Sequence, residues 1–197
     1  MDKLSYAWGL AMGMQLKAMG VKEVSLDSFK DGVKVAFDGG TPEMSPEEAQ
    51  QLINEYLEGL QKEAAEAAQS EAKAFLEENS KKEGVKVTAS GLQYKVLKEG
   101  EGAQPTAEDE VTVHYTGKLL NGTVFDSSVN RGEPATFPLN RVIPGWTEGV
   151  QLMKEGAKYE FYIPSDLAYG PQGIPNVIPP HSTLVFEVEL IKVAKKA

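Results

Sequence analysis

The sequence predicts an α+β protein in two parts. Residues 1–84 should form an all-α dimerisation region with a long connecting helix, and residues 85–197 an antiparallel β-sheet with one short helix against it. Three observations lead to this prediction. Apolar residues recur at helical spacing up to about residue 60, a proline-free run follows a strong helix start at Ser45, and apolar and polar residues alternate from Val85 onward.

The first predicted helix runs from Leu4 to Met19 and is apolar on nearly its whole circumference. A helix that is apolar all round has to be buried. Gly9 and Gly13 stand one turn apart, which favours close contact with a second backbone, although two glycines that merely weaken the helix are the alternative. A second short helix should follow, with Ser25 or Asp27 as its N-cap.

The third predicted helix has the clearest start signal. Ser45 as N-cap, Pro46 at the first helical position and Glu48 three residues after the cap form a capping box. Without a further proline, the helix should continue for about 38 residues, or roughly 57 Å, to a break at Gly84. Its first half should pack against the preceding helices. Its second half, in which Glu63–Lys73 has no large apolar residue, should be a solvated stalk.

Three helices within about 60 residues cannot easily hide this much apolar surface. A partner is therefore expected, and the simplest one is a second copy of the chain, since most soluble oligomers are symmetric homodimers.

The C-terminal half shows the period-two pattern of half-buried antiparallel strands. Asn121-Gly122, between two such runs, predicts a hairpin with a type I′ turn, in which both central residues have positive φ. The residues from Gly145 to Met153 predict the short helix. The predicted strands include Leu92–Val96, Val111–Tyr115, Lys158–Tyr162 and Leu184–Ile191.

Composition excludes several classes of function. The chain has no cysteine, and its two histidines, His114 and His181, are too few for a common zinc site and are expected to be structural. A net charge of −9 argues against a nucleic-acid partner. No apolar run approaches the roughly 18 residues that span a bilayer. We expect no metal or other cofactor, no membrane partner, and a cytoplasmic protein, or a periplasmic one if a signal peptide has been removed.

No motif for covalent catalysis is present. The carboxylates of Glu108–Glu110 are expected to form a solvated turn. Asp126 is either a turn residue that caps local amides or a carboxylate at the rim of an apolar pocket, held by Tyr115 or Arg131. Trp146 is either a core residue or the flat floor of a pocket for a ring-shaped ligand.

Several motifs of the C-terminal half occur in an order that resembles the FKBP family of peptidyl-prolyl cis/trans isomerases: VHYTGKLLNGTVFDSS, VIPGWTEGVQLM, LAYGP and IPPHSTLVFEVEL. The opening residues DKLSYAWG, the capped long helix and the connector SGLQYKV resemble the N-terminal dimerisation region of the bacterial Mip-type members. The resemblance implies a five-stranded sheet around the short helix and a pocket that binds proline.

This resemblance also implies roles for individual residues. Trp146 would form the base of the pocket, and Arg131 would stand near the carboxylate of Asp126. The N–H of Ile143 and the hydroxyl of Tyr169 would hold the carbonyls that flank the prolyl ring. The residues implied to act on or bind the substrate are Tyr115, Phe125, Asp126, Arg131, Phe137, Val142, Ile143, Trp146, Tyr169, Ile174, Ile178 and Phe186.

Two positions depart from the family pattern. Ala135 stands where many members have phenylalanine, and Ile174 stands where several have histidine. A macrolide ligand is expected for the family, and these differences bear on its affinity more than on isomerase activity, because neither position has to transfer a proton.

The function expected from these features is acceleration of Xaa-Pro isomerisation in unfolded or partly folded proteins by a homodimer. Two alternatives are a dimeric chaperone or adaptor whose pocket is only a weak docking site, and a β domain that binds a sugar or another small ligand. The complete set of implied pocket residues favours the isomerase.

Overall fold

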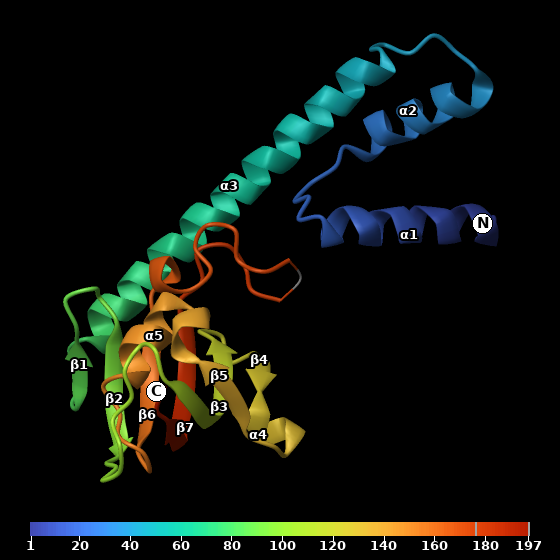
Figure 1. Ribbon diagram of the computed structural model, residues 1–197. Helices are drawn as coiled ribbons and strands as arrows, with labels where there is room; N and C mark the ends of the chain where they lie inside the picture. Colours follow the sequence, from blue (N-terminus) through green and yellow to red (C-terminus); the bar gives the residue numbers. More distant parts are fainter. Residues whose placement is uncertain (176, 197) are drawn as a thin grey trace. The chain divides into compact units, whose positions relative to one another are not determined.

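The computed structural model describes residues 1–175 and 177–196 and contains two compact units, Met1–Ala64 and Ala65–Ala197 (Figure 1). The first unit is helical, and the second contains the end of the long helix and the whole β-sheet. Among the described residues, no helix is both long and apolar enough to cross a membrane.

The helical unit contains α1 (Lys3–Ala18), α2 (Leu26–Asp38) and the first part of α3 (Pro46–Asn79). Each start has a side-chain cap. Asp2 and Ser25 accept hydrogen bonds from backbone N–H groups in the first turns of α1 and α2. At the start of α3, Glu48 N–H donates to Ser45 Oγ at 3.2 Å and Ser45 N–H donates to Glu48 Oε2 at 2.8 Å, which is the predicted capping box.

The apolar surface of the helical unit is not covered within one chain. No residue of α1 or α2 is buried, and Trp8 on α1 is 66% exposed. Leu52 and Ile53 in the first half of α3 are exposed as well. The expected burial of the first helix is therefore not met inside a single copy, because a three-helix unit has too few elements to surround it.

The long helix α3 is shorter than predicted. It ends at Asn79 after 34 residues, about 51 Å at the standard rise, and not at Gly84. Hydrogen bonds from Lys82 N–H to the Asn79 carbonyl and from Val85 N–H to the Lys82 carbonyl replace the helical pattern. Gly84, with φ of 79°, then turns the chain into the first strand.

The last turns of α3 pack on the sheet, so the expectation of a solvated stalk is wrong for this segment. Ala72 and Asn79 are buried, and the Phe75 ring centroid lies 5.9 Å from that of Tyr162. Asn79 Nδ2 donates to Gln93 Oε1 at 3.0 Å. The compact units consequently divide at residue 64/65, whereas the sequence placed the boundary at 84/85.

The sheet is antiparallel throughout, in the order β1-β2-β6-β7-β3-β4, with β5 also paired to β3. The family resemblance implied five strands. The count differs because β4 and β5 pair with successive parts of the same strand, β3, on either side of the short helix α4, and because β1 adds a three-residue edge. The strands are β1 (Val85–Val87), β2 (Gln93–Lys98), β3 (Glu110–Leu119), β4 (Val124–Ser127), β5 (Ala135–Pro138), β6 (Lys158–Ile163) and β7 (Leu184–Ala194).

The hairpin between β3 and β4 forms as predicted, but its turn is of another type. Gly122 has φ of 86°, whereas Asn121 does not have positive φ, so the type I′ geometry is wrong. Gly122 N–H donates to the Leu119 carbonyl and Leu119 N–H donates to the Thr123 carbonyl, each at 2.9 Å. Asn121 instead uses its side-chain oxygen to accept from Thr123 N–H.

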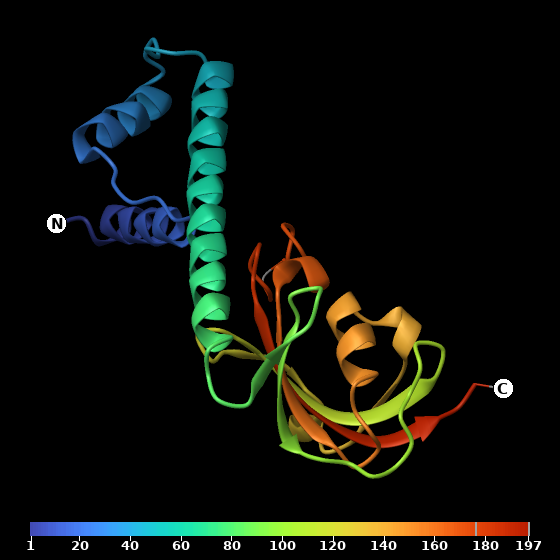
Figure 2. The same ribbon diagram turned by 90° about the vertical axis from the view of Figure 1, so that its left-hand side faces the viewer.

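The short helix α5 (Pro144–Val150) lies on the concave side of the sheet, and its buried residues complete the core (Figure 2). Its approach is close, because a Cβ at Gly145 would lie 2.4 Å from Ile163 Cγ2. The remaining short elements are α4 (Ser128–Arg131), η1 (Leu139–Arg141) and η2 (Ser165–Leu167).

Candidate active site

A cavity of about 410 Å³ opens on the sheet unit above α5. Its walls come from β3, β4, β5 and β7, from the segment joining η1 to α5, and from the loop after η2. The lining is mainly apolar. The lining residues are Tyr115, Phe125, Asp126, Phe137, Arg141, Val142, Ile143, Trp146, Tyr169 and Phe186.

The buried indole of Trp146 is surrounded by aromatic rings at near-right angles. Its centroid lies 5.1 Å from Tyr115, 5.3 Å from Phe186 and 5.9 Å from Phe137, with interplanar angles of 89°, 82° and 90°. Edge-to-face contacts of this kind are favourable and fix the ring planes. The sequence places Trp146 here by starting α5 with Pro144 directly after Ile143, the N-cap residue.

Phe125 of β4 and Phe186 of β7 contact each other beside Gly117 of β3. Phe125 and Phe186 contact each other at 85° with centroids 5.5 Å apart. A Cβ at Gly117 on β3 would lie 2.6 Å from Phe125 Cζ and 2.7 Å from Phe186 Cε1. The two rings therefore occupy the space that a side chain at Gly117 would fill.

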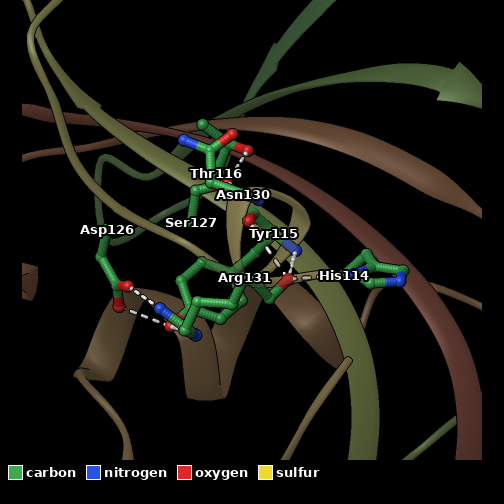
Figure 3. A network of polar contacts seen from close by, with 8 residues as sticks. His114, Tyr115, Thr116, Asp126, Ser127, Asn130 and Arg131 are labelled. Carbon is green, nitrogen blue, oxygen red and sulfur yellow. Dashed lines mark hydrogen bonds and ion pairs between the residues drawn. The ribbon is translucent and has the colours of Figure 1, made fainter. Parts of the chain in front are cut away.

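One polar network stands at the edge of this apolar cavity (Figure 3). Tyr115 Oη donates to Asp126 Oδ2 at 2.5 Å, and Arg131 forms an ion pair with Asp126. Arg131 Nη2 also donates to Tyr115 Oη at 3.1 Å. Both carboxylate oxygens of Asp126 thus have a partner, and its predicted neighbours are the ones that the structure brings to it.

The electrostatics of the network keep each group in its ordinary charge state near neutral pH. Burial opposes ionisation of Asp126, but the hydrogen bonds from Tyr115 and Arg131 outweigh it and lower the pKa of the carboxyl. Burial, with the bond to Asp126, raises the pKa of Tyr115, and the bonds to Tyr115 and Asp126 raise the pKa of Arg131. None of the three is suited to exchange a proton at pH 7.

Hydrogen bonds of small polar side chains hold the network in place from the side. Ser128 Oγ accepts from Tyr115 N–H at 2.8 Å and lies 3.1 Å from His114 Nδ1. Ser127 Oγ accepts from Asn130 N–H at 3.2 Å as the cap of α4. These bonds tie α4 to β3 and so position Arg131 at the end of α4. His114 acts in this support and does not line the cavity.

The hydrogen-bond donors of the cavity that lack an acceptor among the described residues include the indole N–H of the buried Trp146, the backbone N–H of Ile143 and the hydroxyl of Tyr169, which is 38% exposed. Burial, together with the charge of Asp126, raises the pKa of Tyr169, so the hydroxyl keeps its proton and can donate it in a hydrogen bond.

The structure brings nine of the predicted site residues to the cavity lining and Arg131 to its polar edge. Ile174 and Ile178 lie elsewhere. Ile178 is 2% exposed in the core, and Ile174 N–H donates to its carbonyl at 2.7 Å. Sequence reasoning missed Arg141. Its position just before Val142 in the VIPGW motif was the available signal.

In the described part of the chain, no group of three or more His, Cys, Asp or Glu side chains could hold a metal ion.

Comparisons with known proteins cover the whole chain. Residues 1–96 match the family model for the domain amino-terminal to FKBP-type peptidyl-prolyl isomerase, and residues 101–191 match that for FKBP-type peptidyl-prolyl cis-trans isomerase. A probable FKBP-type isomerase FkpA from Neisseria meningitidis is 50% identical over 98% of this chain and 74% of that protein. The crystal structure of FkpA from Escherichia coli superimposes with a TM-score of 0.81 at 36% identity, covering 98% of this chain and 96% of that one.

A relative from Legionella longbeachae, 42% identical over 100% of this chain and 87% of that protein, is named an outer membrane protein, MIP. The predicted cytoplasmic location therefore finds no support in the comparisons. The family resemblance, by contrast, is confirmed over both halves of the chain, and the isomerase is favoured over the adaptor. The chain belongs to the FKBP-type peptidyl-prolyl cis-trans isomerases and is an enzyme of that class.

Proposed function

We propose that the cavity above α5 is the site of isomerisation and that it acts by binding the twisted prolyl amide better than the planar one. Rotation about an Xaa-Pro bond is slow because amide resonance must be broken, with a barrier of about 18 to 20 kcal/mol. The planar amide has a polar resonance form that water stabilises, and the twisted amide has lost it. An apolar site therefore favours the transition state, which is catalysis by differential binding.

In this proposal the prolyl ring lies against the indole of Trp146. Phe125, Phe186, Val142 and Tyr115 exclude water from the ring. The observation that carries the proposal is the combination of a buried indole with three aromatic rings around it in one cavity. A five-membered apolar ring fits such a floor, and its burial contributes in proportion to the apolar area removed from water.

The substrate backbone is held by two of the unpaired donors. Ile143 N–H and Tyr169 Oη–H bind the carbonyls on either side of the prolyl ring, so that the rotating bond lies between two fixed points. Asp126 orients the polar edge through Tyr115 and Arg131 and transfers no proton, in keeping with its lowered pKa.

We further propose that the enzyme acts as a homodimer on unfolded or partly folded proteins that contain proline. The exposed apolar residues of α1, including Trp8, favour a second copy as the partner. A macrolide is expected to bind the same cavity, with its affinity set in part by Ala135 and Ile174, the two positions that depart from the family pattern. A periplasmic location is the remaining proposal for the compartment, and cell fractionation would test it.

The site can be tested with the chain's two tryptophans. In a protease-coupled assay on a short proline peptide, Trp146→Leu should lower kcat/KM about tenfold or more, because burial against a large side chain is worth roughly 1.5–3 kcal/mol. Trp8→Leu, a change of the same kind in the helical unit, should leave this activity near that of the parent protein. Full activity of Trp146→Leu would show that isomerisation does not take place in this cavity.

A further inference from the structure

We propose that Arg141 makes this isomerase selective for substrates that carry a carboxylate next to the proline. The inference concerns the charge of the cavity and rests on the proposal that the cavity binds the prolyl ring.

Arg141 is the cavity's uncompensated charge. Asp126 also lines the cavity, but its ion pair with Arg131 and its bond from Tyr115 satisfy both oxygens. Among the ion pairs of the described residues, none includes Arg141. The cavity consequently presents one net positive charge and the donors of a guanidinium to whatever enters it.

The use of arginine at this position, in place of lysine, also supports a role in binding a carboxylate. The chain contains only two arginines, Arg131 and Arg141, and every other basic side chain is lysine. Both arginines stand at this one cavity, in a protein with 29 Asp and Glu residues and a net charge of −9. A guanidinium differs from an ammonium because its planar fork makes two parallel hydrogen bonds to a carboxylate. Arg131 already binds a carboxylate inside the protein, donating through Nη1 to Asp126 and through Nη2 to Tyr115 Oη.

The position of Arg141 decides which part of the substrate it meets. Arg141 ends η1, and the extended residue Val142 separates it from Ile143, whose free N–H is proposed to bind a carbonyl beside the prolyl ring. A carboxylate bound by Arg141 therefore belongs to a residue that flanks the proline. Such a carboxylate can come from an Asp or Glu side chain or from the C-terminus of a peptide that ends there.

The experiment measures cis/trans exchange by two-dimensional NMR, which needs no coupled protease and so allows any residue beside proline. The substrates are N-acetylated, C-amidated pentapeptides Ala-Leu-Pro-Xaa-Ala and Ala-Xaa-Pro-Leu-Ala, with Glu or Gln as Xaa. A separate peptide ending in Pro-Gln with a free C-terminus distinguishes a terminal carboxylate from a side-chain one. The quantity of interest is the ratio of kcat/KM for the Glu peptide over its Gln counterpart.

We expect this ratio to be about three to five in the parent protein at low salt for one of the two positions, the size of a partly exposed ion pair. Arg141→Ala should bring it to about one, Arg141→Glu should invert it, and Arg141→Lys should keep part of it. Added salt should reduce it as well, because exposed ion pairs are screened. Lys192→Ala removes the same charge from an exposed site on β7 and serves as the matched control, with the ratio unchanged.

A ratio near one in the parent protein at both positions, or the same ratio in the parent and in Arg141→Ala, overturns the proposal. These results differ from failure of the proposed site itself. If the cavity is not where isomerisation occurs, Trp146→Leu retains full activity on the Gln peptides. If only the role of Arg141 is wrong, Trp146→Leu loses activity while the Glu/Gln ratio stays insensitive to Arg141.

Discussion

The two units of this chain differ in how far they bury their apolar side chains, and the two tryptophans show the difference. Trp8 in the helical unit is 66% exposed, and Trp146 in the sheet unit is 5% exposed under a cage of aromatic rings. The sheet unit closes its own core, from Leu92 to Leu190, whereas α1 and α2 contribute no buried residue. The comparison teaches that the sheet unit buries its apolar residues within a single copy, whereas the helical unit leaves its apolar residues exposed.

The largest expected effect is on assembly. Deletion of residues 1–64 should give a monomer by analytical ultracentrifugation, and the full chain should sediment as a dimer, since the apolar helices leave with the deletion. This boundary keeps Ala72, Phe75 and Asn79, which pack on the sheet unit. Turnover of a short proline peptide should stay within about twofold, while acceleration of refolding of a proline-limited protein should fall, because a dimer raises the local concentration of sites.

A monomeric full chain, or a truncated protein equally effective on the refolding substrate, would show that the helical unit has another purpose.

A second test compares core substitutions in the two units. Phe161→Ala, at a fully buried position, should destabilise the sheet unit by about 3–5 kcal/mol. Leu10→Ala on α1, in the helical unit, should leave the stability of the sheet unit nearly unchanged, because Leu10 is no part of the sheet unit's core. Urea unfolding followed by Trp146 emission in a Trp8→Phe background reports the sheet unit alone. Equal losses from both substitutions would mean that the units unfold as one.

The third effect is on turnover. Asp126→Leu removes the partner of Tyr115 and Arg131 and should lower kcat/KM on the order of tenfold, the size of one hydrogen bond to a charged group. Asp126→Asn keeps an acceptor and should be less damaging. Near-ultraviolet circular dichroism should show an intact fold in both variants. If Asp126→Leu were unfolded, Asp126 would be needed for the stability of the fold and its role in the site would remain without support.

The smallest effect concerns pH. Because the pKa of Asp126 is lowered from a value near 4, the carboxylate is charged well above that point, and its contribution is lost only as pH falls through the lowered pKa. Activity on a short peptide should therefore be nearly flat from about pH 6 to 8. A bell-shaped profile within this window would indicate proton transfer and contradict the proposed mechanism.

Much of the fold could be predicted from local signals. Ser25 and Ser45 mark helix starts because capping depends on residues within one turn, and strand alternation follows from the period of the pleat. The end of α3 could not be predicted, because it depends on contacts with Gln93 and Tyr162 from distant strands. For the same reason the turn at Asn121 took a geometry that two residues alone do not determine.

The candidate site was predictable mainly through the family resemblance. Apolar lining such as Phe137 cannot be told from core by periodicity, since both lie on the inner face of the sheet. Ile178 illustrates the ambiguity, because it fell on the core side. Arg141 was missed because a polar residue near a pocket motif reads as ordinary surface until the cavity is seen.

Gly117 has a consequence for engineering. The rings of Phe125 and Phe186 occupy the space beside its α-carbon, so the dimensions of the cavity are controlled from a backbone position that lines none of it. An alanine there would displace both rings and so change the shape of the chamber. Ligand size could thus be tuned without altering any group that touches the ligand.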